Sequence, residues 1–262
     1  MLPRLRGVFV TGTDTEVGKT LVAGAIARQL RYAGRRVEVF KPVATGCRRD
    51  RHGLVSADAE FLAACADSRR TLAEIAPVRY AAAAAPNVAA RRERRPVDLE
   101  AIFRQCAQLE GAAEAVIVEG IGGLLCPITD EFWVAHLARL MGLPVVIVAR
   151  AGLGTVNHTL LTLHAARSAG LQVAGVVINR YRVEPPSSGG PQTSTLTYSR
   201  GDADLAMSTN PQQIAQLGAV KVLAIVPDDP SSSVEKLCVG DDVRFAIAQA
   251  DWEGIAGLTL RD

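Results

Sequence analysis

The chain has 262 residues, of which 48% are hydrophobic and 21% are charged. This composition is typical of a soluble globular protein with a sizeable core, built as one large α/β domain or two small ones. The net charge of +2 gives no argument for a nucleic-acid or membrane partner, and no apolar run approaches the roughly 20 residues that span a bilayer.

The five cysteines are scattered, odd in number and free of any Cys-x-x-Cys spacing. A reduced compartment fits this pattern better than a disulfide framework. The N-terminal residues lead straight into the first expected strand and leave no room for a signal peptide. We therefore expect a cytoplasmic protein.

Residues 6–20 carry the strongest local pattern in the chain. The apolar run Val8–Val10 has strand length, a polar loop follows, and Gly18-Lys19-Thr20 leads into a helical pattern over 21–33. Strand, loop and helix are the context of a phosphate-binding loop, in which backbone N–H groups point at an anion. Lys19 is then expected to reach the outer phosphates and Thr20 to ligate Mg²⁺.

The spacing of this loop departs from the usual motif. The usual loop has four residues between its first Gly and Gly-Lys-[Ser/Thr], whereas Gly12 precedes Gly18 by five intervening residues. Thr13 therefore occupies the first-Gly position.

Strand-like and helical patterns alternate along the rest of the chain. Nearly continuous Val- and Ile-rich runs predict buried strands at 36–41, 115–118, 145–149, 173–178 and 222–226. Helical patterns lie near 57–66, 98–109, 133–141, 156–169, 211–217 and 243–250. This alternation predicts an α/β fold of the P-loop NTPase type, a mostly parallel sheet with helices on both faces. We expect a single domain over 1–262, with a long polar surface loop near 182–206.

Three side chains at strand or helix ends are candidates for chemistry. Lys41 ends the second strand before Pro42, and Glu119 closes a buried strand before a Gly-rich turn, as in a Walker-B-type Mg²⁺ site. Asp58 lies at the start of a helix. The alternatives are a surface lysine at a strand end and, for Asp58, a charge that complements the helix dipole.

Two asparagines form weaker signals. Asn157 lies near the start of the 156–169 helix, where backbone N–H groups could hold a carboxylate or where ordinary capping takes place. Asn179 ends a strand and could read the edge of a nucleobase. The four histidines make no set with the spacing of metal ligands.

Four segments, in chain order, carry a resemblance to one family. They are Gly-Thr-Asp-Thr-Glu-Val-Gly-Lys-Thr at 12–20, Lys-Pro-Val-Ala-Thr-Gly at 41–46, Val-Glu-Gly-Ile-Gly-Gly at 118–123 and Gly-Leu-Gly-Thr-Val-Asn-His at 152–158. Together they resemble dethiobiotin synthase. The resemblance runs from residue 8 to about 179 and less clearly to 227.

The resemblance implies a homodimeric P-loop enzyme of biotin biosynthesis. Such an enzyme closes the ureido ring of dethiobiotin from 7,8-diaminononanoate (7,8-diaminopelargonate), CO₂ and ATP with Mg²⁺. The implied route passes through a carbamate and a carbamic–phosphoric anhydride.

The resemblance also assigns roles to matching residues. The implied ATP-binding residues are Thr13, Asp14, Thr15, Glu16, Val17, Gly18, Lys19, Thr20, Asp58, Glu119, Asn179 and Pro227, the last two at the adenine. The implied metal ligands are Thr20, Asp58 and Glu119, and the implied catalytic residues are Lys41, Lys19 and Thr45. The substrate is expected to meet Thr45 and the turn formed by Gly154, Thr155, Val156 and Asn157, with that turn serving the partner subunit's site. Ile121 departs from the usual Ala beside Glu119, and Thr45 replaces a commoner Ser.

Three other classes are alternatives. A deviant-P-loop regulatory switch ATPase carries an extra Lys early in its loop, where this chain has Thr13-Asp14. A cobyrinate-type amidoligase usually needs a glutamine amidotransferase domain, for which 262 residues leave no space. A GTPase is disfavoured because the chain has no Asn-Lys-x-Asp motif.

Overall fold

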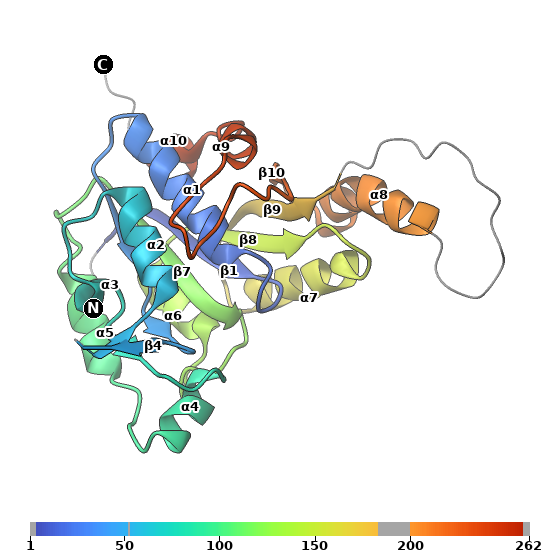
Figure 1. Cartoon of the computed structure of the whole chain (residues 1–262). Helices are drawn as coiled ribbons and strands as arrows, with labels where there is room; N and C mark the ends of the chain where they lie inside the picture. The colour runs from blue at the N-terminus through green and yellow to red at the C-terminus, as the bar shows by residue number, and fades with distance from the viewer. Residues whose placement is uncertain (1–3, 52, 183–199, 259–262) are drawn as a thin grey trace.

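A six-stranded parallel sheet forms the centre of the molecule in the order β10-β9-β8-β1-β7-β2 (Figure 1). The computed structural model describes residues 4–51, 53–182 and 200–258. The strands of this sheet are β1 (Gly7–Gly12), β2 (Val37–Phe40), β7 (Ala115–Gly123), β8 (Val145–Arg150), β9 (Val173–Tyr181) and β10 (Val222–Pro227). Two short pairs lie outside it: β3 (Val43–Ala44) with β6 (Val78–Arg79), and β4 (Arg48–Asp50) with β5 (Gly53–Val55).

Helices connect the strands and cover both faces of the sheet (Figure 1). Their bounds are α1 (Lys19–Tyr32), α2 (Ala57–Ala66), α3 (Leu72–Ile75), α4 (Pro86–Arg92), α5 (Leu99–Ala107), α6 (Val134–Met141), α7 (Thr155–Ser168), α8 (Arg200–Gly218), α9 (Asp241–Ile247) and α10 (Trp252–Ile255). Parallel strands need such crossovers, and the crossovers bring every carboxyl end of the sheet to one edge.

Two hydrophobic cores lie on opposite faces of the sheet, and β1 contributes to both. Val8 and Val10 pack with α1, α2, α9 and α10, whereas Phe9 packs with α5, α6, α7 and α8. This division follows from the two-residue period of a strand, which sends successive side chains to opposite faces. Because β1 is covered on both faces, it forms a rigid base for the loop that follows it.

The predicted α/β fold is confirmed, and the differences concern element boundaries. Each predicted strand and helix has a counterpart, for example the predicted helix 57–66 in α2. The predicted surface loop at 182–206 lies mostly outside the described residues. The prediction of a loop was wrong for residues 200–206, because these residues form the first turns of α8. The helix-forming side chains Leu205 and Ala206 belong to this continuous helix, which a window centred on 211–217 missed.

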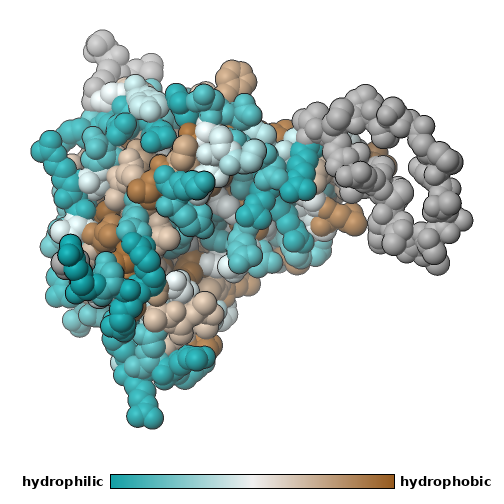
Figure 2. Space-filling view, viewed as in Figure 1, coloured by the Kyte–Doolittle hydropathy of each residue, from teal (hydrophilic) through white to brown (hydrophobic). Residues whose placement is uncertain are grey.

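The visible surface is largely hydrophilic. In the view of Figure 2, polar side chains cover most of the face, and apolar side chains are exposed in small patches. Within the described ranges, no helix combines the length and the apolar character that crossing a membrane requires. All five cysteines are free.

Candidate active site

The loop between β1 and α1 (residues 13–18, the phosphate loop) turns the chain sharply into the helix. Gly18 has φ 91° and Glu16 has φ 60°, both in the left-handed region. A side chain at Gly18 would overlap the amide of Asn179, so this position needs glycine. No side chain caps α1, and no acidic residue lies in its first turn. The N-terminus of α1 therefore offers backbone N–H groups and the positive end of the helix dipole to an anion.

Lys19 is the first residue of α1 and lies beneath the phosphate loop. Its side chain is largely buried, and its ammonium donates a hydrogen bond to Asp14 O at 2.7 Å. Burial lowers the pKa of Lys19, and the nearby charge of Lys41 lowers it further, against the opposing effect of Glu119. A bound polyphosphate would compensate this poorly solvated positive charge.

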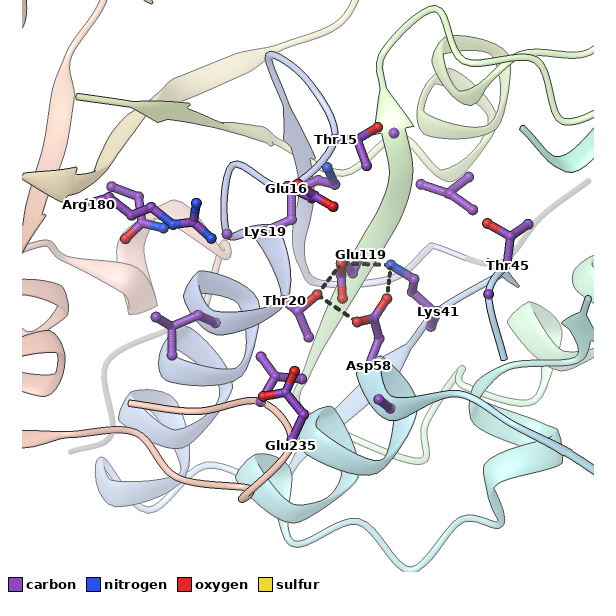
Figure 3. A pocket seen from close by; sticks show the side chains of 18 of the residues that line it. Thr15, Glu16, Lys19, Thr20, Lys41, Thr45, Asp58, Glu119, Arg180 and Glu235 are labelled. Atoms are coloured by element: carbon purple, nitrogen blue, oxygen red, sulfur yellow. Dashed lines mark hydrogen bonds and ion pairs between the residues drawn. The ribbon is translucent and has the colours of Figure 1, made fainter. Parts of the chain in front are cut away.

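Four polar side chains from different elements meet at the carboxyl edge of the sheet (Figure 3). The Thr20 hydroxyl lies 3.0 Å from Asp58 Oδ1 and 2.8 Å from Glu119 Oε1. The ammonium of Lys41 lies 2.7 Å from Glu119 Oε1 and 2.9 Å from Asp58 Oδ2. It also donates to Gly120 O at 3.2 Å, so all three of its N–H groups have partners.

The charges in this cluster depend on each other. Burial alone would lower the pKa of Lys41, but Glu119 and Asp58 outweigh it, so the pKa lies above its ordinary value. Burial raises the pKa of Glu119, and Lys41 only partly opposes this shift. The pKa of Asp58 is lowered, because Lys41 and the Thr20 hydroxyl together outweigh its burial. The cluster therefore holds a charged lysine between the carboxyl groups of Asp58 and Glu119.

The donor set of this cluster fits a Mg²⁺ ion. Glu119 is 1% exposed, and its second oxygen, Oε2, is buried without a hydrogen-bond partner in the described part of the chain. Hard oxygen donors such as two carboxylates and a hydroxyl suit Mg²⁺, which usually keeps several waters and needs few protein ligands. Thr20, Asp58 and Glu119 are thus suited to hold the metal, although among the described residues no group of three or more His, Cys, Asp or Glu side chains forms a metal site.

A cavity of about 1020 Å³ opens over this cluster and joins it to the phosphate loop. Most of the residues that the sequence suggested line it: Thr15, Glu16, Gly18, Lys19, Thr20, Lys41, Thr45, Asp58, Glu119, Asn179 and Pro227. In Figure 3, Thr45 lies beyond Lys41 as seen from the phosphate loop. The structure therefore places the residues suggested for phosphate binding, metal binding and catalysis around one cavity.

One end of this cavity has the features of a base-binding site. Asn179 is 1% exposed and donates its amide N–H to Val17 O at 2.9 Å. Its Oδ1 is buried and has no partner among the described residues. Pro227, at the end of β10, lines the same cavity. An unsatisfied amide oxygen beside the phosphate loop is suited to accept a hydrogen bond from a nucleobase amino group.

Several suggested residues lie outside this cavity. Thr13 donates its N–H to Val148 O at 2.9 Å and does not line the cavity. Asp14 and Val17 line a second cavity of about 300 Å³ on the other side of the phosphate loop. The turn at 154–157 lines neither cavity, and Gly154 begins α7 with φ 88° and no side-chain cap. Any role of this turn in binding requires a site other than the cavity of its own chain.

Sequence reasoning missed part of the cavity wall. The missed polar and charged residues are Arg180, Asp228, Asp229, Ser232, Ser233 and Glu235. Arg180 lies in β9 just before this strand ends, and the others follow the carboxyl end of β10. The rule that ligands bind at the carboxyl ends of strands could have found them. Cys126 and Ile121 also line the cavity, near Glu119.

The fold and site define the class of protein. The features of a P-loop nucleotide-binding enzyme are a parallel sheet with a phosphate loop after a central strand, a buried lysine in the helix that follows the loop, and a buried carboxylate on the neighbouring strand. A family model described as "AAA domain" matches residues 6–236.

Comparison with relatives gives the particular family. The chain is 42% identical to ATP-dependent dethiobiotin synthetase BioD of Anaeromyxobacter sp. (strain K), over 86% of this chain and 92% of that protein. It is 34% identical to the same enzyme of Bacillus subtilis (strain 168), over 85% of this chain and 87% of that protein. The chain belongs to the ATP-dependent dethiobiotin synthetase family.

Solved structures agree on the fold. The chain resembles the MinC:MinD cell division protein complex of Aquifex aeolicus with a TM-score of 0.56 and 12% identity, over 98% of both chains. It resembles a ParA family ATPase from Chlorobium tepidum TLS with a TM-score of 0.52 and 11% identity, over 93% of this chain and 97% of that one. At these identities the likeness shows the fold alone.

Proposed function

We propose that this chain works as a single domain that closes the ureido ring of dethiobiotin from 7,8-diaminononanoate, CO₂ and ATP, releasing ADP and phosphate, as a step of biotin biosynthesis. Family membership supports the reaction. The observation that carries the proposal is the convergence of Lys19, Lys41 and the Thr20–Asp58–Glu119 group on one cavity beside the phosphate loop.

The proposed reaction has three steps. One amine of the substrate adds to CO₂ and loses a proton, giving a carbamate. A carbamate oxygen attacks the γ-phosphorus of ATP, the bond to ADP breaks, and a carbamic–phosphoric anhydride forms. The second amine then attacks the carbonyl carbon and loses a proton, the C–O bond to phosphate breaks, and the ring closes. The phosphoryl step joins two anions, so positioning and positive charge are the main requirements of catalysis.

The two buried lysines supply this charge in our proposal. Lys19 emerges beneath the phosphate loop and serves the outer phosphates. Lys41 lies between the two carboxyl groups and Thr45, and it serves the carbamate and the transferring phosphoryl group (Figure 3). The Thr45 hydroxyl orients the diamine. Charged donors held in place before the reaction stabilise the transition state without reorganisation at the moment of transfer.

Thr20, Asp58 and Glu119 would hold Mg²⁺. The metal ion, when bound, neutralises phosphate charge and acts as a Lewis acid. In the structure every N–H group of Lys41 is engaged by the two carboxylates and Gly120 O. Were the same two carboxylates also to hold the metal ion, Lys41 would have donors to offer the carbamate.

We also propose a homodimer in which the turn at 154–157 binds the substrate carboxylate of the partner subunit's site. The turn does not line the cavity of its own chain, yet it presents uncapped N–H groups and no acidic side chain. Two leucines of the same segment, Leu153 and Leu161, are 63% and 60% exposed. Exposed leucines before and within a helix whose start is uncapped fit a surface that another subunit covers.

The nucleotide base is placed against Asn179 and Pro227 in this proposal. The buried, unpartnered Oδ1 of Asn179 is an acceptor for the adenine amino group, which favours ATP over a 6-oxo purine nucleotide. The free state of all five cysteines fits a reduced, cytoplasmic location.

Product analysis tests the function. Purified protein is incubated with ATP, MgCl₂, bicarbonate and 7,8-diaminononanoate, and the products are analysed by mass spectrometry. We expect dethiobiotin and ADP in equal amounts, and no ADP without the diamine. ATP turnover that is independent of the diamine would instead support the alternative, a regulatory switch ATPase, and would refute this proposal.

A further inference from the structure

Arg180 is a third cation in the wall of the active-site cavity, besides Lys19 and Lys41. The two lysines have partners, namely Asp14 O for Lys19 and the two carboxylates with Gly120 O for Lys41. The exposed guanidinium of Arg180 forms no hydrogen bond or ion pair with the described residues. In Figure 3 it points toward the phosphate loop. Its charge is therefore available to a ligand.

The backbone at Arg180 is distorted in a way that aims this side chain. Ile178 pairs with Ile225 and Tyr181 with Pro227, so β9 advances by three residues where β10 advances by two. This extra residue forms a bulge, and Arg180 lies in it with φ 59°. Bulges near active sites often redirect a side chain, and left-handed geometry in a non-glycine residue persists where the surrounding structure enforces it.

The electrostatics of the phosphate loop call for such a cation. The loop carries two carboxylates, Asp14 and Glu16, close to where a polyphosphate binds. Arg180 lines both the active-site cavity with Glu16 and the second cavity with Asp14 and Glu16. A guanidinium there offsets carboxylate charge that would otherwise repel the nucleotide.

Arg180 also has the right neighbours along the chain. It follows Asn179, whose amide holds Val17 O and whose side chain packs against Gly18. A nucleotide with its base at Asn179 and its outer phosphates at Lys19 must run along the loop between them, and the Arg180 guanidinium points to that stretch (Figure 3). Arg182, two residues further along the chain, forms an ion pair with Asp228 at 2.7 Å, so its charge is already compensated.

We propose that Arg180 is a nucleotide-binding residue whose guanidinium contacts the phosphates of the bound nucleotide, between the base site at Asn179 and the ammonium of Lys19. This inference rests on the proposed function in that the nucleotide is ATP. Arg180 lies on the side of the phosphate loop that faces away from the metal ligands, and sequence reasoning did not find it.

Nucleotide binding by variants tests this role. Dissociation constants for MgADP and for adenosine are measured by calorimetry for wild type, Arg180→Gln, Arg180→Lys and the control Arg139→Gln, which removes an exposed arginine of α6. We expect Arg180→Gln to weaken MgADP binding about 10-fold, since a charge-assisted contact is worth roughly one such factor. Adenosine binding should change less than about two-fold, because adenosine carries no phosphate. Arg180→Lys should recover part of the loss, and Arg139→Gln should match wild type.

Two further results separate this role from others. Equal weakening of MgADP and adenosine would overturn the phosphate contact and indicate stacking on the base. Unchanged MgADP binding in Arg180→Gln would overturn the proposal altogether. Arg180→Gly, which suits φ 59°, should keep the melting temperature of wild type or raise it while it weakens MgADP binding. ADP binding needs no diamine. The binding test therefore stays valid even if product analysis of the wild type shows that the proposed reaction does not take place.

Discussion

The ammonium of Lys41 lies 2.7 Å from Oε1 of Glu119, and both side chains are almost completely buried. A buried ion pair of this kind is weak evidence for stability, because removing two charges from water offsets most of their attraction. The pair lies instead in the wall of a cavity that also contains the phosphate loop. We propose that the two charges serve the reaction, and the variants below test this.

Lys41→Ala should lower kcat by about 10²–10³-fold, since this is the usual loss of one preorganised transition-state donor. The measurement is initial-rate kinetics at saturating ATP and diamine. Lys221→Ala, which removes an exposed lysine directly before β10, is the control and should keep wild-type turnover. Near-normal kcat in Lys41→Ala would remove Lys41 from the mechanism.

Glu119→Gln should raise the Mg²⁺ concentration needed for half-maximal activity by at least about 10-fold, because even outer-shell metal partners contribute about 10–100-fold in affinity. The substitution keeps the shape of the side chain and removes the negative charge that faces Lys41. Glu100→Gln, at an exposed position of α5, should leave the titration unchanged. If the Mg²⁺ titrations of Glu119→Gln and wild type coincide, Glu119 is not a ligand.

The affinity for MgADP should fall as the pH rises toward 10.5. Burial lowers the pKa of Lys19 below its usual value of 10.5, so its ammonium loses the charge that binds phosphate before an exposed lysine would. Lys41 stays charged over this range, because its pKa is raised. Lys41→Ala should shift the decline to higher pH, since Lys41 is one of the charges that lowers the pKa of Lys19. The decline is measured by calorimetry at pH values from about 7.5 up to about 10.5, the upper end being near the pKa of an exposed lysine. An unchanged affinity across that range would contradict the role of Lys19.

Gly24→Ala should destabilise the protein and weaken its metal site. Gly24 lies where α1 crosses α2, and an added Cβ would overlap the fully buried ring of Phe61 and lie 2.9 Å from Cys65 Sγ. The gain of about 1 kcal/mol in helix propensity is smaller than the overpacking cost of about 1–3 kcal/mol. The difference predicts a loss of up to about 2 kcal/mol in the free energy of unfolding, measured by chemical denaturation.

The link to the metal site comes from α2, which carries both Phe61 and Asp58. A displaced α2 moves Asp58 away from Thr20 and Lys41, so the Mg²⁺ requirement of Gly24→Ala should rise. Adding Phe61→Leu should restore part of both properties by making space. Full stability and a normal Mg²⁺ titration in Gly24→Ala would show that the two helices can separate freely.

The sequence was sufficient to predict the side chains that lie near the carboxyl ends of the strands. Lys41 directly follows β2, and Glu119 lies within β7, which continues to Gly123 rather than ending at Glu119 as the sequence suggested. Because β2 and β7 are parallel neighbours in the sheet, their carboxyl halves bring the two side chains together. Asp58 joins them because α2 begins beside the same edge. Local patterns placed these residues well, since each one directly follows or begins a strongly periodic element.

Other features depend on contacts between distant segments, which a local pattern does not contain. The bulge at Arg180 arises from the register of β9 against β10. The backbone N–H of Thr13 donates a hydrogen bond to Val148 O of β8, and the spacing of the motif could not indicate this bond. The pairing of β4 with β5 was also missed, because β4 consists of charged, exposed residues that carry no strand-like pattern. Which subunit the turn at 154–157 serves stays a prediction from the resemblance.

Mixed dimers provide a test of that last prediction. Gly154→Asp places a carboxylate at the uncapped start of α7, where it can occupy the free N–H groups and repel the substrate carboxylate. We expect a raised KM for the diamine and an unchanged KM for ATP. Lys41→Ala is defective in a different part of the site. If the turn serves the partner's site, a dimer of the two variants contains one site with both an intact Lys41 and an intact turn.

Random exchange between equal amounts of the two variants makes about half of the dimers mixed, so about a quarter of all sites should recover activity, as the two-fold symmetry of a homodimer requires. Activity is measured at a diamine concentration below the KM of Gly154→Asp, before and after subunit exchange. If the turn served the cavity of its own chain, every site in a mixed dimer would keep one defect, and exchange would restore nothing. A monomer in light scattering would give the same lack of recovery, and either result would refute the shared site, whereas recovery near one quarter requires that each subunit completes the site of the other.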